Sequence, residues 1–162
     1  MMRTLSLLLL AATLAGCAAA PKPKYTIGFE KEAPIIVGAS DISLRMAEDL
    51  RAYNNPLIFN ADGTVVPCKT LNYYAPLEVL LASTLRQATT FTLQKGIFPI
   101  TVQAFHADLR GPTPIARVTL ENPTTHATVT RTADLPEGWT AQDLRLALAK
   151  LLRETYLDLI AK

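Results

Sequence analysis

The stretch ITVQAFHADLRGPTPIARVTLENPTTHATVTRT, residues 100–132, decides the fold of this 162-residue chain. Apolar and polar side chains alternate along it in three runs, a pattern typical of strands with one face on a core and one in water. Gly-Pro-Thr-Pro at 111–114 and Asn-Pro at 122–123 are turn signals between the runs. The alternation slips by one residue after Ala104, which is the effect of a β-bulge. The stretch therefore predicts a three-stranded antiparallel meander.

One helix is expected before this meander and one after it. Pro76 opens the first helix, because proline lacks the N–H that would be unpaired in a first turn. Leucines at helical spacing then continue to about 87–90. Thr140 opens the second helix in a capping-box arrangement with Asp143, and a leucine-rich face runs to about Ile160.

Three shorter strands complete the expected sheet. A β-branched run predicts a strand at about 35–43, and Asn-Ala-Asp-Gly joins strands at 57–59 and 64–66 in a hairpin. The polar residues 45–56 are expected to form a loop. The fold class is α+β, a mixed or mostly antiparallel sheet with two main helices packed on one face, within one domain at 35–162.

The N-terminal end has the pattern of a lipoprotein leader. Arg3 and a short apolar run at 5–14 give residues 1–16 the proportions of a signal peptide, too short to span a membrane. Leu-Ala-Gly-Cys at the end of the leader resembles a bacterial lipobox, so Cys17 is the predicted lipidation site. An ordinary secretory signal with a chance cysteine is the alternative. Ala18 resembles the default sorting to the outer membrane of a Gram-negative cell.

Residues 17–34 are predicted to be a lipidated N-terminus and a tether. Pro21 and Pro23 favour an extended chain between the anchor and the domain. Lys22 and Lys24 could touch anionic lipid head groups, or could serve solubility alone.

The composition excludes several classes of function. The formal net charge of +2 lacks the concentrated basic character of a nucleic-acid binder. Cys17 and Cys68 are the two cysteines, and a lipid on the first leaves no partner for a disulfide and no Cys-rich metal site. Cys68 is interpreted as a small buried hydrophobe, with a nucleophile as the alternative.

No phosphate-binding loop, nucleophile elbow or zinc-protease motif occurs in the sequence. His106 and Asp108 share one face of a predicted strand, and His126 lies on the third predicted strand at 125–132. These three residues could form a metal site or an acid–base cluster, but a solvated polar sheet face is the preferred interpretation. We therefore expect a protein that is not an enzyme and that has no metal and no cofactor.

Five residues are candidates for contact with a partner. They are Tyr73 and Tyr74 before the first helix, and Leu146, Leu157 and Ile160 outside the main apolar face of the second. The tyrosines could instead pack under the helix start and over a sheet edge. The three aliphatic residues could instead be covered by the tether or by the loop at 45–56.

A lipobox, a proline-bearing tether and a strand–hairpin–helix unit follow one another in this chain. The last unit ends in YYAPLE at 73–78, an aromatic residue just before Pro-Leu, and NPLI stands at 55–58. In this order the chain resembles the ABC-type transport auxiliary lipoprotein family, of the paraquat-inducible C type. Tyr73 takes the place of the family's tryptophan, and Asn55 that of its arginine.

This resemblance implies a non-catalytic component of an MCE/ABC-type lipid transport system between the inner and outer membranes. The protein would be anchored in the outer membrane with its domain facing the periplasm. Its partners would be an MCE-domain periplasmic protein and the transporter components, and a homo-oligomeric ring is possible. Only Cys17 carries over as a functional residue. The alternative function is a lipoprotein regulator of a cell-envelope enzyme that acts on peptidoglycan.

Overall fold

The computed structural model describes residues 26–29, 32–71, 73 and 75–162. In chain order the elements are β1 (Ile35–Val37), β2 (Asp41–Met46), β3 (Leu57–Phe59), β4 (Val65–Pro67), α1 (Leu77–Ala88), β5 (Thr89–Phe91), β6 (Ile97–Asp108), β7 (Ile115–Asn122), β8 (Ala127–Asp134) and α2 (Ala141–Ile160). The predicted leader at 1–16 and Cys17 lie outside the described residues.

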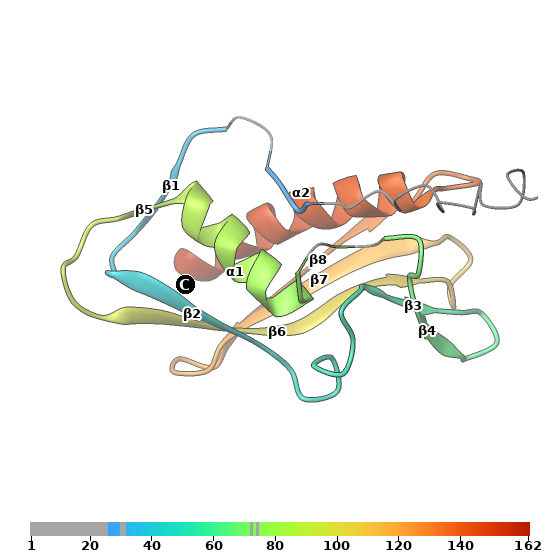
Figure 1. Cartoon of the computed structure of the whole chain (residues 1–162), viewed down its shortest axis with the longest axis horizontal. Helices are drawn as coiled ribbons and strands as arrows, with labels where there is room; N and C mark the ends of the chain where they lie inside the picture. Colours follow the sequence, from blue (N-terminus) through green and yellow to red (C-terminus); the bar gives the residue numbers. More distant parts are fainter. Residues whose placement is uncertain (1–25, 30–31, 72, 74) are drawn as a thin grey trace, which may run out of the picture.

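The long strand β6 is the centre of a six-stranded mixed sheet (Figure 1). On one side β6 pairs with β7, which pairs with β8, and both pairings are antiparallel. On its other side β6 has two parallel neighbours, β2 along its first half and β3 along its second. The hairpin partner β4 closes that side. The meander predicted from residues 100–132 is therefore confirmed.

The expected β-bulge lies in β6, next to its predicted position. The register with β7 shifts between Val102 and Ala104, so that Val102 is opposite Leu120 and Phe105 is opposite Val118. This shift explains why residues with opposite parity face the same core. It also turns Ala104 and the residues in phase with it to the other face of the sheet.

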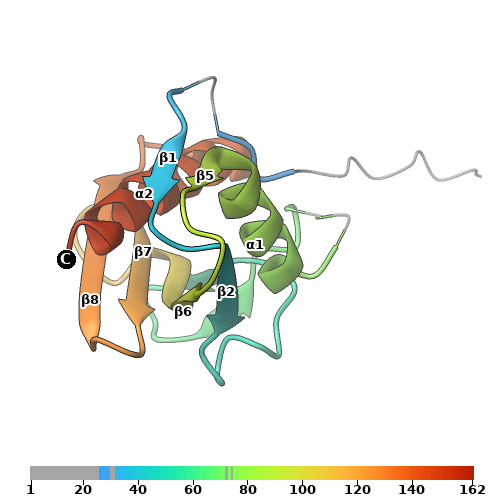
Figure 2. The same ribbon diagram turned by 90° about the vertical axis from the view of Figure 1, so that its left-hand side faces the viewer.

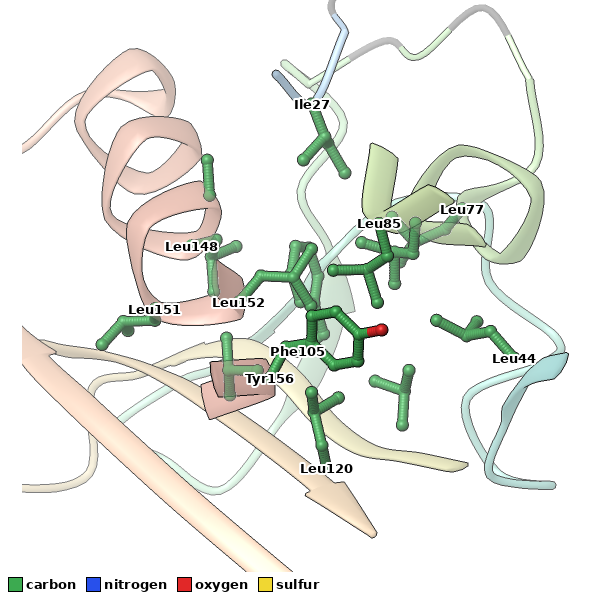
Figure 3. Packing of buried hydrophobic residues seen from close by; sticks show 14 of the residues in the cluster. Ile27, Leu44, Leu77, Leu85, Phe105, Leu120, Leu148, Leu151, Leu152 and Tyr156 are labelled. Atoms are coloured by element: carbon green, nitrogen blue, oxygen red, sulfur yellow. The ribbon is translucent and has the colours of Figure 1, made fainter. Parts of the chain in front are cut away.

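Both helices cover the same face of the sheet (Figure 2). α2 packs on β7 and β8, and α1 packs beside β2. Figure 3 shows Phe105 and Tyr156 at the centre of the core between them. The Tyr156 ring meets the Phe98 ring edge-on, with 6.3 Å between centroids. The predicted α+β class with two helices on one face is confirmed.

The local signals for the helix starts have the expected effects. The Thr140 hydroxyl accepts from the Asp143 N–H, and the Asp143 carboxylate accepts from the Thr140 N–H at 2.8 Å, which completes the capping box. Pro76 is the N-cap of α1 and not its first helical residue. No helix among the described residues is long and apolar enough to cross a membrane.

The single strand predicted at 35–43 is wrong in detail. The chain bends at 38–40 and divides the stretch into β1 and β2, and β2 continues into the predicted loop as far as Met46. β1 pairs in parallel with β5, which no sequence pattern indicated, in a separate two-stranded sheet. The chain thus leaves α1 directly into a short strand.

The predicted tether at 17–34 is folded in the part that the structure describes. Ile27 is 5% exposed and enters the core between α1 and α2 (Figure 3). Its carbonyl accepts from the Thr84 hydroxyl at 2.6 Å. The expectation of a free tether as far as residue 34 is therefore wrong, because the folded unit already includes Ile27.

Candidate interaction surface

In the part of the chain that the structure describes, the sheet has a long edge that pairs with no further strand. β8 is the last strand of the sheet, eight residues in length, and stands at its margin in Figure 2. The edge at the opposite end of the sheet is β4, which has three residues and ends in Pro67. Short strands and prolines protect sheet edges from pairing with other chains, so the two edges differ in what they can accept.

One hydrogen bond fixes the direction of the backbone groups along β8. The Leu135 N–H donates to the Pro114 carbonyl at 2.8 Å, on the side of β7. Backbone groups alternate in direction along a paired strand. The N–H and C=O groups that face outward therefore belong to Thr128, Thr130, Thr132 and Asp134.

All four of these residues are exposed, and no strand of the described structure pairs with this side of β8. The Thr128 carbonyl accepts from Lys162 Nζ at 3.1 Å, and the C-terminal end of the described chain thus reaches one end of the edge. Arg131 binds the carboxylate of Asp158 at 2.7 Å and joins β8 to α2. The strand is thereby held in place while its outer side stays open for strand addition.

The expected tyrosine contact is not available at Tyr73. Its side chain is buried and belongs to the hydrophobic core, and its hydroxyl has no hydrogen-bond partner among the described residues. Burial raises the pKa of the phenol well above its usual value. The proposed partner contact of Tyr73 is therefore wrong, and the packing interpretation fits. Tyr74 lies outside the described residues.

The three aliphatic candidates on α2 differ in exposure. Leu146 is 48% exposed, whereas Leu157 and Ile160 are half-buried and pack against the core. Arg153 lies on the same side of the helix and binds the Glu32 carboxylate at 2.6 Å. The start of the folded chain therefore runs beside this side of α2, and of the three candidates Leu146 is the one that the described residues leave exposed.

The predicted histidine cluster does not form. His106 and Asp108 lie on the same face of β6, as expected, but both are buried, so the expectation of a solvated polar face is wrong. His126 lies in the turn between β7 and β8 with a φ of 56°, not on a strand. Its exposed turn follows Asn122, which is five residues along β7 from the partner of His106. No group of metal-binding side chains occurs among the described residues.

A polar network replaces that cluster. The Asp108 carboxylate accepts from Arg110 through both oxygens, at 2.8 and 2.7 Å, and the Arg110 guanidinium stacks over the Phe59 ring at 4.8 Å. Phe59 also packs against the His106 imidazole, with 4.4 Å between centroids. The Asp108 carboxylate and the His106 imidazole are therefore both engaged in structural contacts.

The surroundings shift two pKa values in this network. Burial and, after it, the positive charge of Arg117 lower the pKa of His106 to about 4. The hydrogen bonds from Arg110 hold the pKa of Asp108 far below its usual value. His106 is consequently neutral at physiological pH, and its Nε2 atom is buried without a partner among the described residues.

Cys68 is buried and forms no disulfide in the described structure. Its sulfur lies 3.4 Å from the Thr70 hydroxyl. This environment fits the predicted role of a small buried side chain.

Comparison with known proteins finds a solved structure of similar fold. No family model and no curated protein matches the chain. Among solved structures the chain is similar to the crystal structure of protein XCC0632 from Xanthomonas campestris, of the family DUF330. The TM-score is 0.54 at 12% identity, over 86% of this chain and 90% of that chain. A structure described as an uncharacterized protein matches at 13% identity with a TM-score of 0.49, over 82% and 93% of the two chains. The first likeness shows a shared fold.

The sequence missed the open edge because strand order is a tertiary property. The threonines of β8 alternate with Val129 and the other inward residues, which indicates a strand with one exposed face. Nothing in that pattern says whether a further strand lies beyond it. After β8 the chain continues into α2 and adds no further strand to the sheet.

Proposed function

We propose that this protein is a lipid-anchored, non-catalytic component of an MCE/ABC-type lipid transport system. Its place is the periplasmic side of the outer membrane, and its task is to dock the MCE-domain protein of that system. The lipobox-like leader and the order of elements at 55–78 support this function. The structural observation that carries the docking role is the open edge of β8.

The edge suits an extended segment of the partner protein. The outward residues of β8 offer main-chain donors and acceptors in one row, of which the Thr128 carbonyl is already taken by Lys162. Main-chain hydrogen bonds give affinity in strand addition. The exposed threonines of β8 are β-branched and favour the extended conformation that such pairing needs. A second copy of the chain could use the same edge, and the experiment below distinguishes the two.

A proline tests the edge with little effect on the rest of the sheet. The Thr132 N–H faces outward, so Thr132→Pro removes an outward donor and keeps the bonds to β7. Thr132→Ala is the matched control, because it shortens the side chain and keeps the N–H. Cys17→Ala removes the predicted lipid site.

The measurement is a pull-down of the full-length lipidated protein from crosslinked cell envelopes, read by mass spectrometry. We expect the wild type and Thr132→Ala to recover an MCE-domain protein and its permease, and Thr132→Pro to lose them. Peptidoglycan enzymes without an MCE-domain protein would support the alternative, a regulator of a cell-envelope enzyme. Recovery of the chain alone, again lost in Thr132→Pro, would assign the edge to self-association.

A further inference from the structure

A hollow of about 560 Å³ lies at the end of the molecule where α2 begins. The turn between β6 and β7 supplies Pro112 and Pro114, and the connection from β8 to α2 supplies Leu135 and Trp139. Glu137 is the one charged residue among those that line the hollow. The surface is thus an apolar, aromatic rim of rigid turns with little charge.

Trp139 is held in a fixed place in this rim. Gly138 adopts a φ of +67°, a conformation that favours glycine, and the Trp139 N–H donates to the Pro136 carbonyl at 3.1 Å. The indole is half-buried and packs against the core. A tryptophan with one side packed and one side open matches the amphipathic position that this residue takes at membrane–water interfaces.

A second exposed apolar side chain, that of Val65, lies at the same end of the molecule. Val65 is 41% exposed on β4 and is opposite Phe59, which is opposite Asp108 at the end of β6. The turn that holds the two prolines begins directly after Asp108. Figure 1 shows the hairpin of β3 and β4 and the start of α2 at the same end of the molecule. The two apolar contacts could therefore meet one surface.

The described chain begins in the same half of the molecule. The Thr26 carbonyl accepts from Arg145, in the second turn of α2, at 3.1 Å. Nine residue steps separate Thr26 from Cys17, which an extended chain covers in about 30 Å. Arg145 is four residues from the first residue of α2 and 15 from the last, about 6 Å and about 22 Å along the helix axis, so the chain that leads to Cys17 starts nearer to this end.

The geometry points to a membrane contact, and we propose that the surface of Pro112, Pro114, Trp139 and Val65 rests on a zwitterionic lipid surface. This inference depends on the lipid anchor of the proposed function. The low charge of the rim fits lipid head groups without net charge, because Glu137 would be repelled by anionic ones. The anchor then fixes the distance to the membrane, and the rim fixes the orientation of the domain.

The protein contains its own probe, since Trp139 is the only tryptophan of the chain. The full-length lipidated protein is reconstituted in phosphatidylcholine vesicles, with and without bromine on the acyl chains, and the vesicles are isolated by flotation. We expect the emission of Trp139 to shift to shorter wavelength and to lose most of its intensity in the brominated vesicles. Vesicle-bound protein with an unquenched Trp139 would overturn the inference and leave the anchor intact.

A displaced probe gives the matched control. The variant Trp139→Phe with Leu93→Trp carries its tryptophan in the connection from β5 to β6, at the far end of Figure 1, where Leu93 is 55% exposed. We expect this variant to float with the vesicles and to remain unquenched; equal quenching at both positions would contradict a fixed orientation. Wild-type protein that does not float, as is expected of Cys17→Ala, would remove the proposed anchor and the inference with it.

Discussion

His106 is a polar residue of the predicted exposed strand face that the structure buries. It is 7% exposed, beside Phe59 and near Arg117, and burial lowers its pKa to about 4. The unfolded chain has an ordinary histidine pKa of 6.5. Between these values the unfolded state binds the proton first, so protonation favours unfolding.

Stability is therefore expected to fall as the pH is lowered through this window. The contribution of His106 is fully present above about pH 6.5, and its loss amounts to about 2 kcal/mol between pH 7.5 and pH 5. Urea unfolding at several pH values measures this slope. His106→Gln removes the titration and should flatten the curve in that range, whatever its effect on absolute stability.

His126→Asn is the control for this experiment. It removes the histidine of the exposed turn between β7 and β8, and asparagine tolerates the φ of 56° found there. A curve flattened as much in His126→Asn as in His106→Gln would contradict the assignment of the pH dependence to His106.

At this scale the sequence predicted what depends on near neighbours. The capping residue Thr140 and the turn glycine Gly63, with a φ of +85°, were readable because the signal lies within three or four residues. The burial of His106 was not readable, because Phe59 reaches it from 47 positions earlier. The alternation of β6 gave the correct face for His106 but not what covers that face.

At the scale of elements, the start of the folded chain contributes to the core. Ile27→Ala is expected to lower the free energy of unfolding by about 2–4 kcal/mol, since it leaves a cavity between the two helices. Chemical denaturation measures the change. Gly28→Ala is the neighbouring control, because nothing lies within 4 Å of an added Cβ there, and it should have little effect. An unchanged midpoint in Ile27→Ala would show that the segment is not part of the cooperative unit.

The capping box of α2 allows a second test at this scale. Thr140→Ala removes the side-chain acceptor for the Asp143 N–H and should cost about 1 kcal/mol. Thr140→Ser keeps the hydroxyl and should stay close to the wild type in thermal unfolding. Equal losses in both variants would point to the methyl group of the threonine and not to the cap.

The lengths of the elements decided which were predictable. α2, β6, β7 and β8 have eight residues or more, and each repeats its hydrophobic period several times. β5 has three residues, Thr-Thr-Phe, and too few alternations to be recognised after α1. β1 and β2 were merged in the prediction because their residues are equally β-branched or apolar, and only the bend at 38–40 separates them.

At the scale of the whole molecule, the pairings predict an order of local opening. The pair β6–β7 and helix α2 enclose the core, whereas β1 and β5 form a separate sheet of three residues each. Native-state hydrogen exchange should show the slowest amides in β6, β7 and α2, with exchange by global unfolding. The amides of β1 and β5 should exchange earlier. Equal protection in both sheets would mean that the molecule opens as one unit.

The segment that binds Arg145, Thr84 and Arg153 also has a mechanical consequence. Force applied at the N-terminal end of the described chain acts on these contacts before it reaches the strand pairings of the main sheet. Once released and extended, residues 26–34 span at most about 30 Å. The domain thus has a link that lengthens stepwise under tension. The rest of the domain can stay folded while the distance to its attachment point increases.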